Sequence, residues 1–439
     1  MSSLNAKTEA SPHATRDSSY LRLLLIVLGT ATFFEGYDSA ISAVVLQDLA
    51  RSFEVPLDET ASITGPIIPV GLGAFGALLV TMLGDRIGRR PLLIGTTFAY
   101  ALFTGLTATA NDLPTFVVYQ FFARSFLLAE YATAVTIVTE EFPAARRGRA
   151  LGTLTALGAL GLPIVAVLNL WAGRSPEGWR ILYLVGLIPL VVVGFLRMKL
   201  KETSRWVESR ALSTPRVSRK DRLKHVIALA HPGTLLKVGG LYFFSHFALL
   251  AAATWWPFYA GVRLGFSDGK IATLLGIAYP LGVSGYYLAG RLQDRYGRRR
   301  TGALFLVFGM VFGILVFQLD SAAWMFPAMI LAVFFGFGMN PVLAAVASEL
   351  FPTSIRATAV GVVRSVFGTV GGIIGPVTVG ILADPRVAER LPGWPVFGDL
   401  GDSVCVAILA NIPALLLLMS LPETAGRELE SITAALDTP

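Results

Sequence analysis

One charged six-residue motif occurs twice in this chain, at positions 209 residues apart. Asp-Arg-Ile-Gly-Arg-Arg occupies residues 85–90, and Asp-Arg-Tyr-Gly-Arg-Arg occupies residues 294–299. A second pair of motifs keeps the same offset, because Glu-Glu-Phe-Pro at residues 140–143 is matched by Glu-Leu-Phe-Pro at residues 349–352. Several charged motifs that all recur at the same spacing are not expected by chance. The chain therefore consists of two copies of one unit.

Composition places both copies in a lipid bilayer. Hydrophobic residues make up 54% of the 439 residues and charged residues only 15%, whereas soluble domains carry about 25% charged residues. Twelve segments reach the length of about 20 mainly apolar residues that crosses a membrane. The predicted spans are residues 20–45, 60–83, 91–110, 113–140, 147–172, 179–199, 234–261, 268–290, 300–319, 323–349, 356–383 and 399–421. We therefore expect an all-α membrane protein with twelve transmembrane helices in two pseudo-symmetric six-helix bundles, an organisation typical of secondary transporters.

The polar segments between the spans predict the domain organisation and the orientation. The segment from Arg197 to Lys224 contains ten basic and three acidic residues, so the positive-inside rule places it, both repeated loops and both termini in the cytoplasm. Residues 1–19 lack the features of a signal peptide, so we expect the first span to remain in the mature protein. A short surface helix is predicted at Leu223–Leu229. The expected units are an N-terminal tail (1–19), a first bundle (20–199), a linker (200–233), a second bundle (234–421) and a C-terminal tail (422–439), in a multi-pass protein of the cell membrane.

Several other classes of protein find no support in the sequence. The net charge of +7 comes from short basic links between apolar spans, and no nucleic-acid-binding motif accompanies it. The chain has neither a phosphate-binding Gly-x-x-x-x-Gly-Lys loop nor a Gly-x-Ser-x-Gly nucleophile motif, and it has no cluster of cysteine and histidine. We therefore expect no enzyme activity, no bound metal and no cofactor.

Three motifs together resemble those of the major facilitator superfamily, over nearly the whole chain. Residues 84–90 and their copy resemble the signature loop of that superfamily. Glu202-Thr203-Ser204-Arg205-Trp206 resembles a motif of sugar porters and their metabolite-transporting relatives, although its prolines are missing, and residues 421–430 resemble the Pro-Glu-Thr-x-Gly tail of the same branch. The expected sugar-porter Gln-Gln pair is absent from the seventh span, which argues against a hexose.

The resemblance assigns the repeated loops to a cytoplasmic gate that holds the inner side shut. A carboxylate just past one helix end can approach the N-terminus of a neighbouring helix, where its contact contributes about 0.3–1 kcal/mol. The alternative is that Arg86, Arg90, Arg299 and Arg300 only enforce topology, which we favour for those four residues. The predicted gate comprises Asp85, Arg86, Gly88, Arg89, Arg90, Glu140, Arg147, Asp294, Arg295, Arg298, Arg299, Glu349 and Arg356.

Charged residues inside the spans are the candidates for chemistry, because each costs roughly 2.5–3.5 kcal/mol unless it has a partner or a water-filled cavity. Glu35 and Asp38 are three residues apart, so they project from one face of the first span. Two carboxylates in a low-dielectric cavity repel each other, which favours a proton on one of them. Phe34-Glu35-Gly36-Tyr37-Asp38 also resembles the Asp-Gly-x-Asp of aromatic acid/proton symporters. We predict that Asp38, with Glu35, couples transport to protons; the alternative is that Asp38 pairs with an arginine for structural reasons.

The predicted substrate-binding residues are Arg124, Glu130, His246, Tyr279, Asn340 and Arg364. Guanidinium binds carboxylate through two parallel hydrogen bonds, which makes Arg364 and Arg124 candidate anchors for an organic anion. A salt bridge from Arg364 to the first span is the compatible alternative. Glu130 could instead pair with Arg124, and His246 could be a simple helix contact.

These observations predict a secondary active transporter that works by alternating access, most consistent with proton-coupled import of a small organic acid, aromatic acids included. The expected partners are that small molecule, with an organic anion favoured, and the lipid bilayer, but no nucleic acid, and the carrier is expected to act as a monomer with the proton as its coupling ion. One alternative is a proton-coupled antiporter that exports cationic or amphipathic compounds. A second is a non-transporting sensor with a transporter fold.

Overall fold

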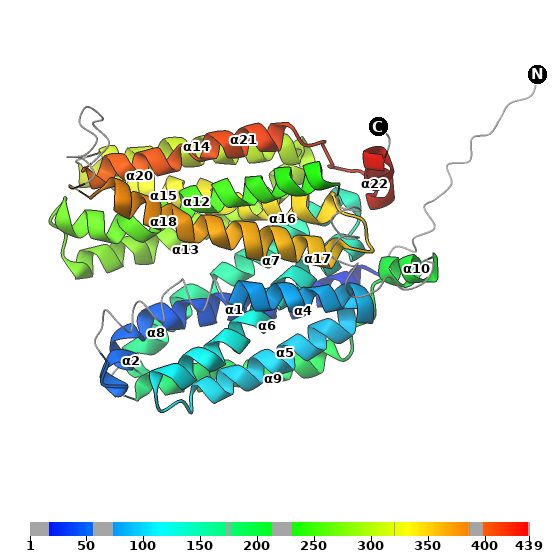
Figure 1. Cartoon of the computed structure of the whole chain (residues 1–439), viewed down its shortest axis with the longest axis horizontal. Coiled ribbons are helices and arrows are strands. Elements are labelled where there is room, and N and C mark those ends of the chain that lie inside the picture. Colours follow the sequence, from blue (N-terminus) through cyan, green and yellow to red (C-terminus); the bar gives the residue numbers. More distant parts are fainter. Residues whose placement is uncertain are drawn as a thin grey trace, which may run out of the picture.

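The computed structural model describes residues 17–55, 73–172, 175, 177–212, 231–319, 321–384, 386 and 398–437. The regular structure in this described part is entirely helical, and the helices form two stacked bundles (Figure 1). The described part of the chain contains nine candidate spans that are long and apolar enough to cross a membrane, three of them built from consecutive helices. The predicted all-α class is confirmed, although part of the predicted span 60–83 lies outside the described residues.

The N-terminal bundle forms the lower half of Figure 1. Its fifth membrane segment is interrupted at Leu160, between α7 and α8. The long helices of this bundle are α1 (Ser18–Val44), α4 (Gly73–Ile87), α5 (Arg89–Thr107), α6 (Leu113–Glu141), α7 (Arg147–Ala159) with α8 (Gly161–Ala172), and α9 (Gly178–Arg197). A short helix, α2 (Leu46–Ser52), follows α1.

The C-terminal bundle repeats this plan in the upper half of Figure 1. Three of its membrane segments are also interrupted. The helices are α12 (Pro232–Val262), α13 (Asp268–Tyr296), α14 (Arg298–Gln318), α15 (Ala322–Gly338) with α16 (Asn340–Glu349), α17 (Arg356–Gly361) with η3 (Val362–Gly368) and α18 (Thr369–Leu382), and α20 (Leu400–Ile408) with α21 (Asn411–Met419). The segment η3 is a π-helix, a local distortion that is frequent at functional sites.

Sequence signals fix several of these boundaries. Gly88 and Gly297 adopt φ angles of 109° and 97°, which only glycine adopts readily, and each allows the tight turn inside a repeated loop. At the start of α6, the Asp112 carboxylate accepts a hydrogen bond of 2.8 Å from the backbone N–H of Thr115. This bond stabilises the ionised form and lowers the pKa of Asp112 below its usual value.

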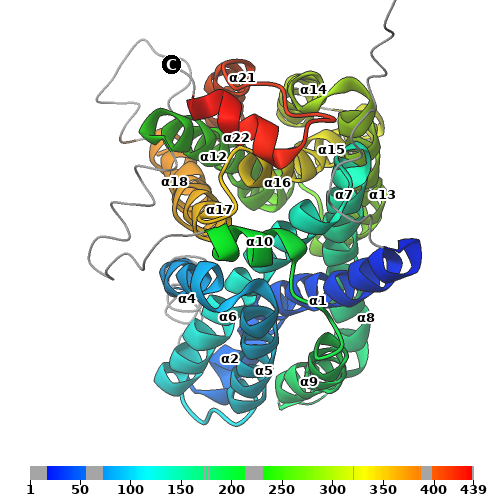
Figure 2. The same cartoon turned by 90° about the vertical axis from the view of Figure 1, so that its right-hand side faces the viewer.

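Two short helices lie across one end of the molecule (Figure 2). They are α10 (Ser204–Leu212), which follows the N-terminal bundle, and α22 (Leu429–Asp437), near the C-terminus. We call this end, which carries both repeated loops, the arginine-rich end. Neither helix was predicted from the sequence, and the predicted helix Leu223–Leu229 lies outside the described residues.

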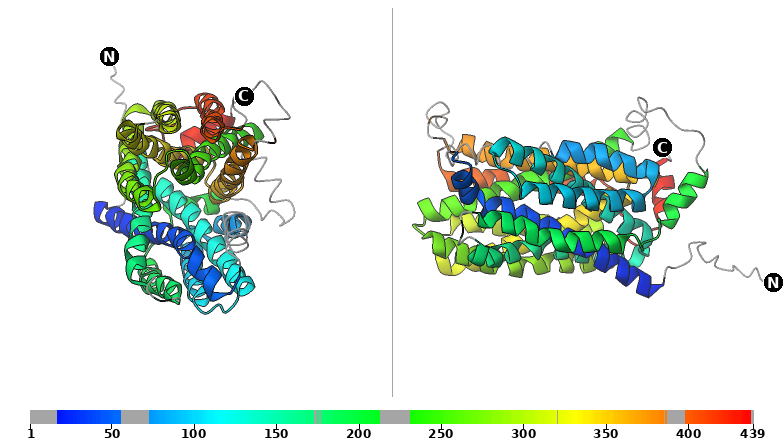
Figure 3. Two further views of the ribbon diagram at one scale, coloured as in Figure 1. Left: turned by 90° about the vertical axis from the view of Figure 1, so that its left-hand side faces the viewer. Right: turned by 90° about the horizontal axis from the view of Figure 1, so that it is seen from below.

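Seen end-on, the two bundles lie one above the other (Figure 3, left). The larger contacts between them join α4, α6 and α7 of the N-terminal bundle to α13, α16, α17 and η3 of the C-terminal bundle. At the arginine-rich end α4 packs against α17, and α7 packs against α13. These two contacts are related by the internal duplication, so each bundle presents the same surfaces to the other.

Candidate functional site

Asp85 connects the two bundles at the arginine-rich end. Its carboxylate lies at the end of α4 and accepts hydrogen bonds from the backbone N–H groups of Ala357 and Thr358, at 3.3 and 3.0 Å. These groups belong to the first turn of α17, whose N–H groups have no partner within the helix. The positive end of the helix dipole adds to the attraction. The predicted approach of this carboxylate to a neighbouring helix N-terminus is therefore seen in the structure.

A buried group of charges lies behind Asp85. Arg89 contacts Asp85 at 3.1 Å and Glu140 at 3.0 Å. Glu140 also binds Arg356 of the other bundle at 3.0 Å. Arg89, Glu140 and Arg356 are almost completely inaccessible to solvent. Removing one member of such a group would leave an uncompensated buried charge, which typically costs about 3–5 kcal/mol.

The second copy of the motif makes the same contacts with the roles of the two bundles exchanged. Asp294 accepts hydrogen bonds of 2.8 Å from the backbone N–H groups of Gly148 and Arg149, in the first turn of α7. Arg298 contacts Asp294 at 3.2 Å and Glu349 at 2.8 Å. Glu349 in turn binds Arg147 of the N-terminal bundle at 3.2 Å.

The pseudo-symmetry axis passes between two hydroxyl groups. Thr139 donates a hydrogen bond of 2.7 Å to Ser348, and these two residues are 209 positions apart in the sequence. Equivalent positions of the two units thus contact each other directly, between the two charged groups. Together the two groups and this hydrogen bond join the two bundles at the arginine-rich end.

Two glutamates of the other sequence motifs hold the loops in place. Glu202 accepts a hydrogen bond of 3.0 Å from the backbone N–H of Arg89, and Glu423 accepts one of 2.9 Å from the backbone N–H of Arg298. The neighbouring hydroxyl groups of Thr203 and Thr424 donate to Glu140 and Glu349. None of these four residues belongs to the predicted gate, although the motifs that contain them are a signal that could have identified them.

The tails also connect the bundles. Arg205 in α10 contacts Glu428 at 2.6 Å and Glu430 at 3.5 Å. The sequence could not reveal this contact, because the partners are more than 200 residues apart and none lies in a membrane span.

The remaining arginines of the repeated loops lie at the periphery. Arg90 and Arg299 donate to the backbone oxygens of Met198 and Met419, at 2.7 and 2.6 Å. Arg295 lies over the ring of its neighbour Tyr296. The backbone oxygen of Arg86 accepts a hydrogen bond of 2.6 Å from Arg210. These contacts stay within one bundle and its attached segments, so the four residues are not part of the contact between bundles that Asp85 and Asp294 make.

A second connection between the bundles lies further along α1 from the arginine-rich end. Glu35 in α1 contacts Arg364 in η3, with 2.9 Å between Oε1 and Nη2. The side chains are 14% and 23% exposed, so this pair is the more accessible of the charge pairs within the bundles. The other terminal nitrogen of Arg364, Nη1, is buried and has no hydrogen-bond partner among the described residues.

Aromatic rings surround Arg364. Its guanidinium lies 3.5 Å from the ring centroid of Tyr131 in α6, in cation–π geometry. The rings of Tyr242 and His246 in α12 stack on each other, with 5.6 Å between centroids. His246 Nδ1 lies 3.0 Å from the backbone oxygen of Tyr242, and its ring packs beside Gly368 at the end of η3. His246 thus lies near Arg364, whereas Tyr131 and Tyr242 were missed because a tyrosine in an apolar span carries no sequence signal of its own.

Asp38 has a different partner from Glu35. It lies 3.4 Å from Arg124 in α6, and both side chains are buried. The Tyr100 hydroxyl in α5 lies close to the Asp38 carboxylate. The backbone oxygen of Asp38 accepts a hydrogen bond of 3.1 Å from Arg124. The two carboxylates of α1 therefore form two separate acid–base pairs, one within the N-terminal bundle and one between the bundles.

Glu130 does not join Arg124 or Arg364. It contacts Arg197 in α9 at 2.8 Å and accepts a hydrogen bond from Thr97 in α5. This pair is buried among α5, α6 and α9, inside the N-terminal bundle. The geometry corrects the suggested pairing of Glu130 with Arg124. Arg197, which was counted among the charges of the basic cytoplasmic segment, is its buried partner.

The last two predicted substrate residues lie in the C-terminal bundle. Asn340 donates a hydrogen bond of 3.0 Å to the backbone oxygen of Phe337, and its side chain approaches the Tyr286 hydroxyl. Tyr279 packs edge-on against Phe337, with ring centroids 5.6 Å apart. Tyr279 lines a cavity inside the C-terminal bundle, away from the charge pairs.

Comparisons with known proteins give the same picture. The sequence profile of the Major Facilitator Superfamily matches residues 28–376. A putative niacin/nicotinamide transporter, NiaP, of Bacillus subtilis (strain 168) is 27% identical over 412 residues, which cover 93% of this chain and 98% of that protein. A 3-(3-hydroxy-phenyl)propionate transporter of Escherichia coli (strain K12) is 28% identical over 402 residues, which cover 87% of this chain and 95% of that protein. The solved structure of the proton:xylose symporter XylE, bound to 6-bromo-6-deoxy-D-glucose, matches with a TM-score of 0.76 at 20% identity over 95% of this chain and 99% of that chain.

Two pseudo-symmetric helix bundles joined by charged groups at one end define a multi-pass membrane transporter rather than an enzyme. The chain belongs to the Major Facilitator Superfamily. The resemblance seen in the sequence motifs is thereby confirmed.

The contact between Asp85 and α17 predicts the first mutational effect. Asp85→Asn should weaken closure of the arginine-rich end, because two backbone N–H groups lose a charged acceptor. Thr353 lies beside this contact, because its backbone oxygen accepts a hydrogen bond from Arg89. In a Cys405→Ser background, we expect a cysteine that replaces Thr353 to react about tenfold faster with a membrane-impermeant thiol reagent in Asp85→Asn than with Asp85 present. Asp17→Asn, the same change at an exposed helix cap, is the control. Equal reaction rates in wild type and Asp85→Asn would contradict a closing role for Asp85.

Proposed function

We propose that this chain is a proton-coupled carrier that imports a small organic acid, with aromatic monocarboxylates as the favoured class. In this proposal the arginine-rich end faces the cytoplasm of the cell, and the closed charged groups correspond to a carrier that is open towards the outside. The observation that carries the proposal is the half-satisfied guanidinium of Arg364, which lies between the bundles with Nη2 on Glu35 and Nη1 without a partner in the described part of the chain.

Arg364 has the properties of a carboxylate anchor. A guanidinium can bind one carboxylate through two parallel hydrogen bonds. Glu35, however, accepts a hydrogen bond from only one terminal nitrogen of Arg364, Nη2. A substrate carboxylate that binds both nitrogens would displace Glu35 and break the mid-depth contact between the bundles. Because η3 is a π-helix, the backbone around Arg364 already departs from regular α-helical geometry.

The surrounding rings favour an aromatic substrate. The guanidinium lies on the ring of Tyr131, and the stacked rings of Tyr242 and His246 are close to it. Aromatic rings attract one another in stacked or edge-to-face arrangements, so a substrate ring beside Arg364 would gain by packing against this group. The names of two relatives support the same class, since one is a putative niacin/nicotinamide transporter and the other a 3-(3-hydroxy-phenyl)propionate transporter.

Asp38 is the proposed proton carrier. Its carboxylate is buried, with Arg124 as its charged neighbour at 3.4 Å and the Tyr100 hydroxyl close by. Protonation would neutralise the Asp38 carboxylate, so that buried Asp38 would no longer need Arg124 as a charged partner. Arg124 would then be free to move away from Asp38. Because Asp38 and Glu35 lie one turn apart on α1, a movement that follows protonation of Asp38 would also shift Glu35 relative to Arg364.

The proposed cycle links these events. A proton from outside binds Asp38, and the substrate carboxylate takes the place of Glu35 on Arg364. Once both charges are neutralised, the bundles can rock about the site, and the charged groups at the arginine-rich end separate. Proton and acid then leave into the cytoplasm.

The role of Arg364 predicts a loss of acid uptake. Proteoliposomes with an imposed inward proton gradient would be tested with nicotinate, benzoate and 3-phenylpropionate. Arg364→Gln should lower uptake of the transported acid about 10- to 100-fold, because a charged hydrogen-bond donor is lost. Arg364→Lys should be intermediate, since it keeps the charge but not the paired donors. Arg146→Gln, at an exposed position, is the control.

Uptake that Arg364→Gln leaves unchanged would remove the proposed anchor. Proton-driven export of amines, with no movement of any acid, would replace the proposed function by the antiporter alternative.

The role of Asp38 predicts a change in coupling rather than in binding. Wild-type uptake should rise as the outer pH falls, whereas Asp38→Asn should lose accumulation driven by the pH gradient. Exchange of labelled for unlabelled acid, which needs no net proton movement, should persist in Asp38→Asn. The same change at the exposed Asp112 is the matched control. Full gradient-driven accumulation by Asp38→Asn would show that the proton travels elsewhere.

A further inference from the structure

Two exposed arginines, one from each bundle, lie beside the contact between α7 and α13. Arg149 belongs to the first turn of α7, and Arg291 lies in the last two turns of α13. The two helices pack side by side (Figure 2). They are antiparallel, because α7 begins at the arginine-rich end and α13 ends there.

Glycines bring the two helices together at this level. A Cβ atom on Gly290 would lie only 2.8 Å from the backbone oxygen of Gly148 and 2.9 Å from the Cα of Gly152. The two backbones therefore touch, as small residues at a helix interface in a membrane allow. Because Gly290 lies level with Gly148 and Gly152, the arginines that follow Gly148 and Gly290 lie at nearly the same depth.

Arg149 and Arg291 also project to the same side of the helix pair. Each residue of an α-helix is turned by about 100° from the residue before it. In two antiparallel helices, the residues that directly follow the contact residues therefore turn towards the same side. Both arginines are exposed, so this side is the outer surface of the protein.

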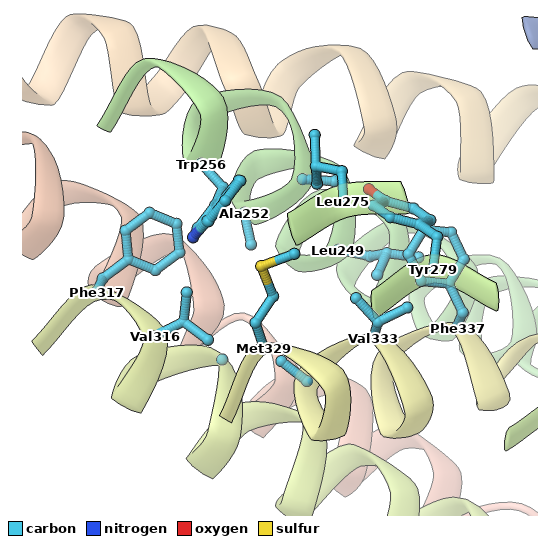
Figure 4. Close-up of a pocket in the computed structure, with 13 residues that line it drawn as sticks. Leu249, Ala252, Trp256, Leu275, Tyr279, Val316, Phe317, Met329, Val333 and Phe337 are labelled. Atoms are coloured by element: carbon cyan, nitrogen blue, oxygen red, sulfur yellow. The ribbon is translucent and has the colours of Figure 1, made fainter. Parts of the chain in front are cut away.

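The outer face of α13 has the character of a surface that faces lipid. Leu275 and Tyr279, on the inward face, line a small cavity inside the C-terminal bundle (Figure 4). On the outer face, Tyr287 and Leu288 are each 40% exposed, about one turn from Arg291. The guanidinium of Arg291 lies 4.4 Å from the ring centroid of Tyr287. We call this region, with Arg149, the α7/α13 surface.

The arginines lie at the boundary of the apolar spans. Arg291 directly follows the predicted span 268–290, and Arg149 lies at the start of the predicted span 147–172. Long basic side chains at such positions place their charged groups at the level of the lipid headgroups.

Neither guanidinium has a carboxylate partner among the described residues. The neighbouring carboxylate of Asp294 already binds the backbone N–H groups of Gly148 and Arg149 and contacts Arg298. A guanidinium binds phosphate through parallel hydrogen bonds. The ammonium of a zwitterionic headgroup would find no available carboxylate among the described residues of this surface, so the charges favour an anionic lipid.

The duplicated contact on the other side of the molecule lacks this pair. At an offset of 209 residues, Thr358 corresponds to Arg149 and Met82 corresponds to Arg291. Arginines anywhere on the arginine-rich end would satisfy the positive-inside rule. That rule therefore does not explain a pair confined to the α7/α13 surface.

We infer that the α7/α13 surface binds the phosphate of an anionic phospholipid, which Arg149 and Arg291 hold between them. Because each bundle supplies one arginine, the bound phosphate joins the bundles in addition to the buried charged groups. Separation of the bundles would break one of its two contacts. Anionic lipid therefore stabilises the state in which the arginine-rich end is joined, whatever substrate the protein carries.

Native mass spectrometry of the full chain in detergent tests the binding. The anionic probe is dioleoylphosphatidylglycerol, and dioleoylphosphatidylcholine has the same acyl chains without a net charge. The wild type should bind the anionic lipid about tenfold more tightly than the neutral one. Arg149→Gln and Arg291→Gln should each weaken binding of the anionic lipid about tenfold, because a charge-assisted hydrogen bond is lost. Arg149→Lys and Arg291→Lys, which keep the charge, should weaken it less. Arg300→Gln, at an exposed position of the same end, is the matched control.

Three results of this measurement would overturn the site. They are equal affinity for the two lipids, binding of the anionic lipid that Arg149→Gln and Arg291→Gln leave unchanged, and an equally large loss in Arg300→Gln. Inorganic phosphate that displaces the lipid at equal concentration would show that the site takes free phosphate and not a lipid.

Thiol reactivity in nanodiscs tests the joining of the bundles. Thr353 lies beside the contact between α4 and α17, apart from α7 and α13 (Figure 2), so lipid on the α7/α13 surface does not shield it directly. In the Cys405→Ser background, a cysteine that replaces Thr353 should react about fivefold more slowly when phosphatidylglycerol replaces part of the phosphatidylcholine. Arg291→Gln should remove most of this effect, and Arg300→Gln should keep it. A reaction rate that the anionic lipid leaves unchanged, or lowers equally in Arg291→Gln, would overturn the joining role.

Discussion

Burying charge in an apolar bundle is the constraint on which this structure depends. A charged side chain within a membrane needs a partner, and the spans of this chain provide one for each buried acid described above. Glu140 and Glu349 bind two arginines each, one from either bundle. The same attractions that make burial tolerable therefore join the two bundles, and any movement that separates the bundles must break them.

Duplication gives these attractions a two-fold arrangement. Each carboxylate at the end of α4 or α13 binds the first turn of a helix in the opposite bundle. Near mid-span the symmetry is broken, because Thr155 occupies the position that corresponds to Arg364. Both residues contact Tyr131, Thr155 through its hydroxyl and Arg364 over the ring. The charged contacts at the arginine-rich end are thus the same in both units, whereas the proposed substrate site uses positions at which the two units differ.

The sequence predicted the fold, because the repeat keeps the charged motifs in one register. Eight of the twelve charged residues in the predicted gate lie in the two buried clusters. The sequence predicted individual pairings less well. Arg197 lies at the end of a span beside a basic linker, and nothing local shows that it binds Glu130 in another helix. The helices α10 and α22 are short and lie outside the spans, so their contacts depend on residues that are distant in the sequence. The aromatic neighbours of Arg364 arise from packing, which hydropathy does not reveal.

In the proposed cycle a substrate carboxylate and Glu35 compete for Arg364. The most direct test is calorimetric measurement of the affinity for the best-transported acid in wild type and in Glu35→Gln, at one pH at which the wild type transports. Glu35→Gln should bind the acid more tightly than the wild type, because the variant lacks the carboxylate that occupies Arg364 Nη2. Weaker or unchanged binding by Glu35→Gln would contradict the exchange of one carboxylate for another at Arg364.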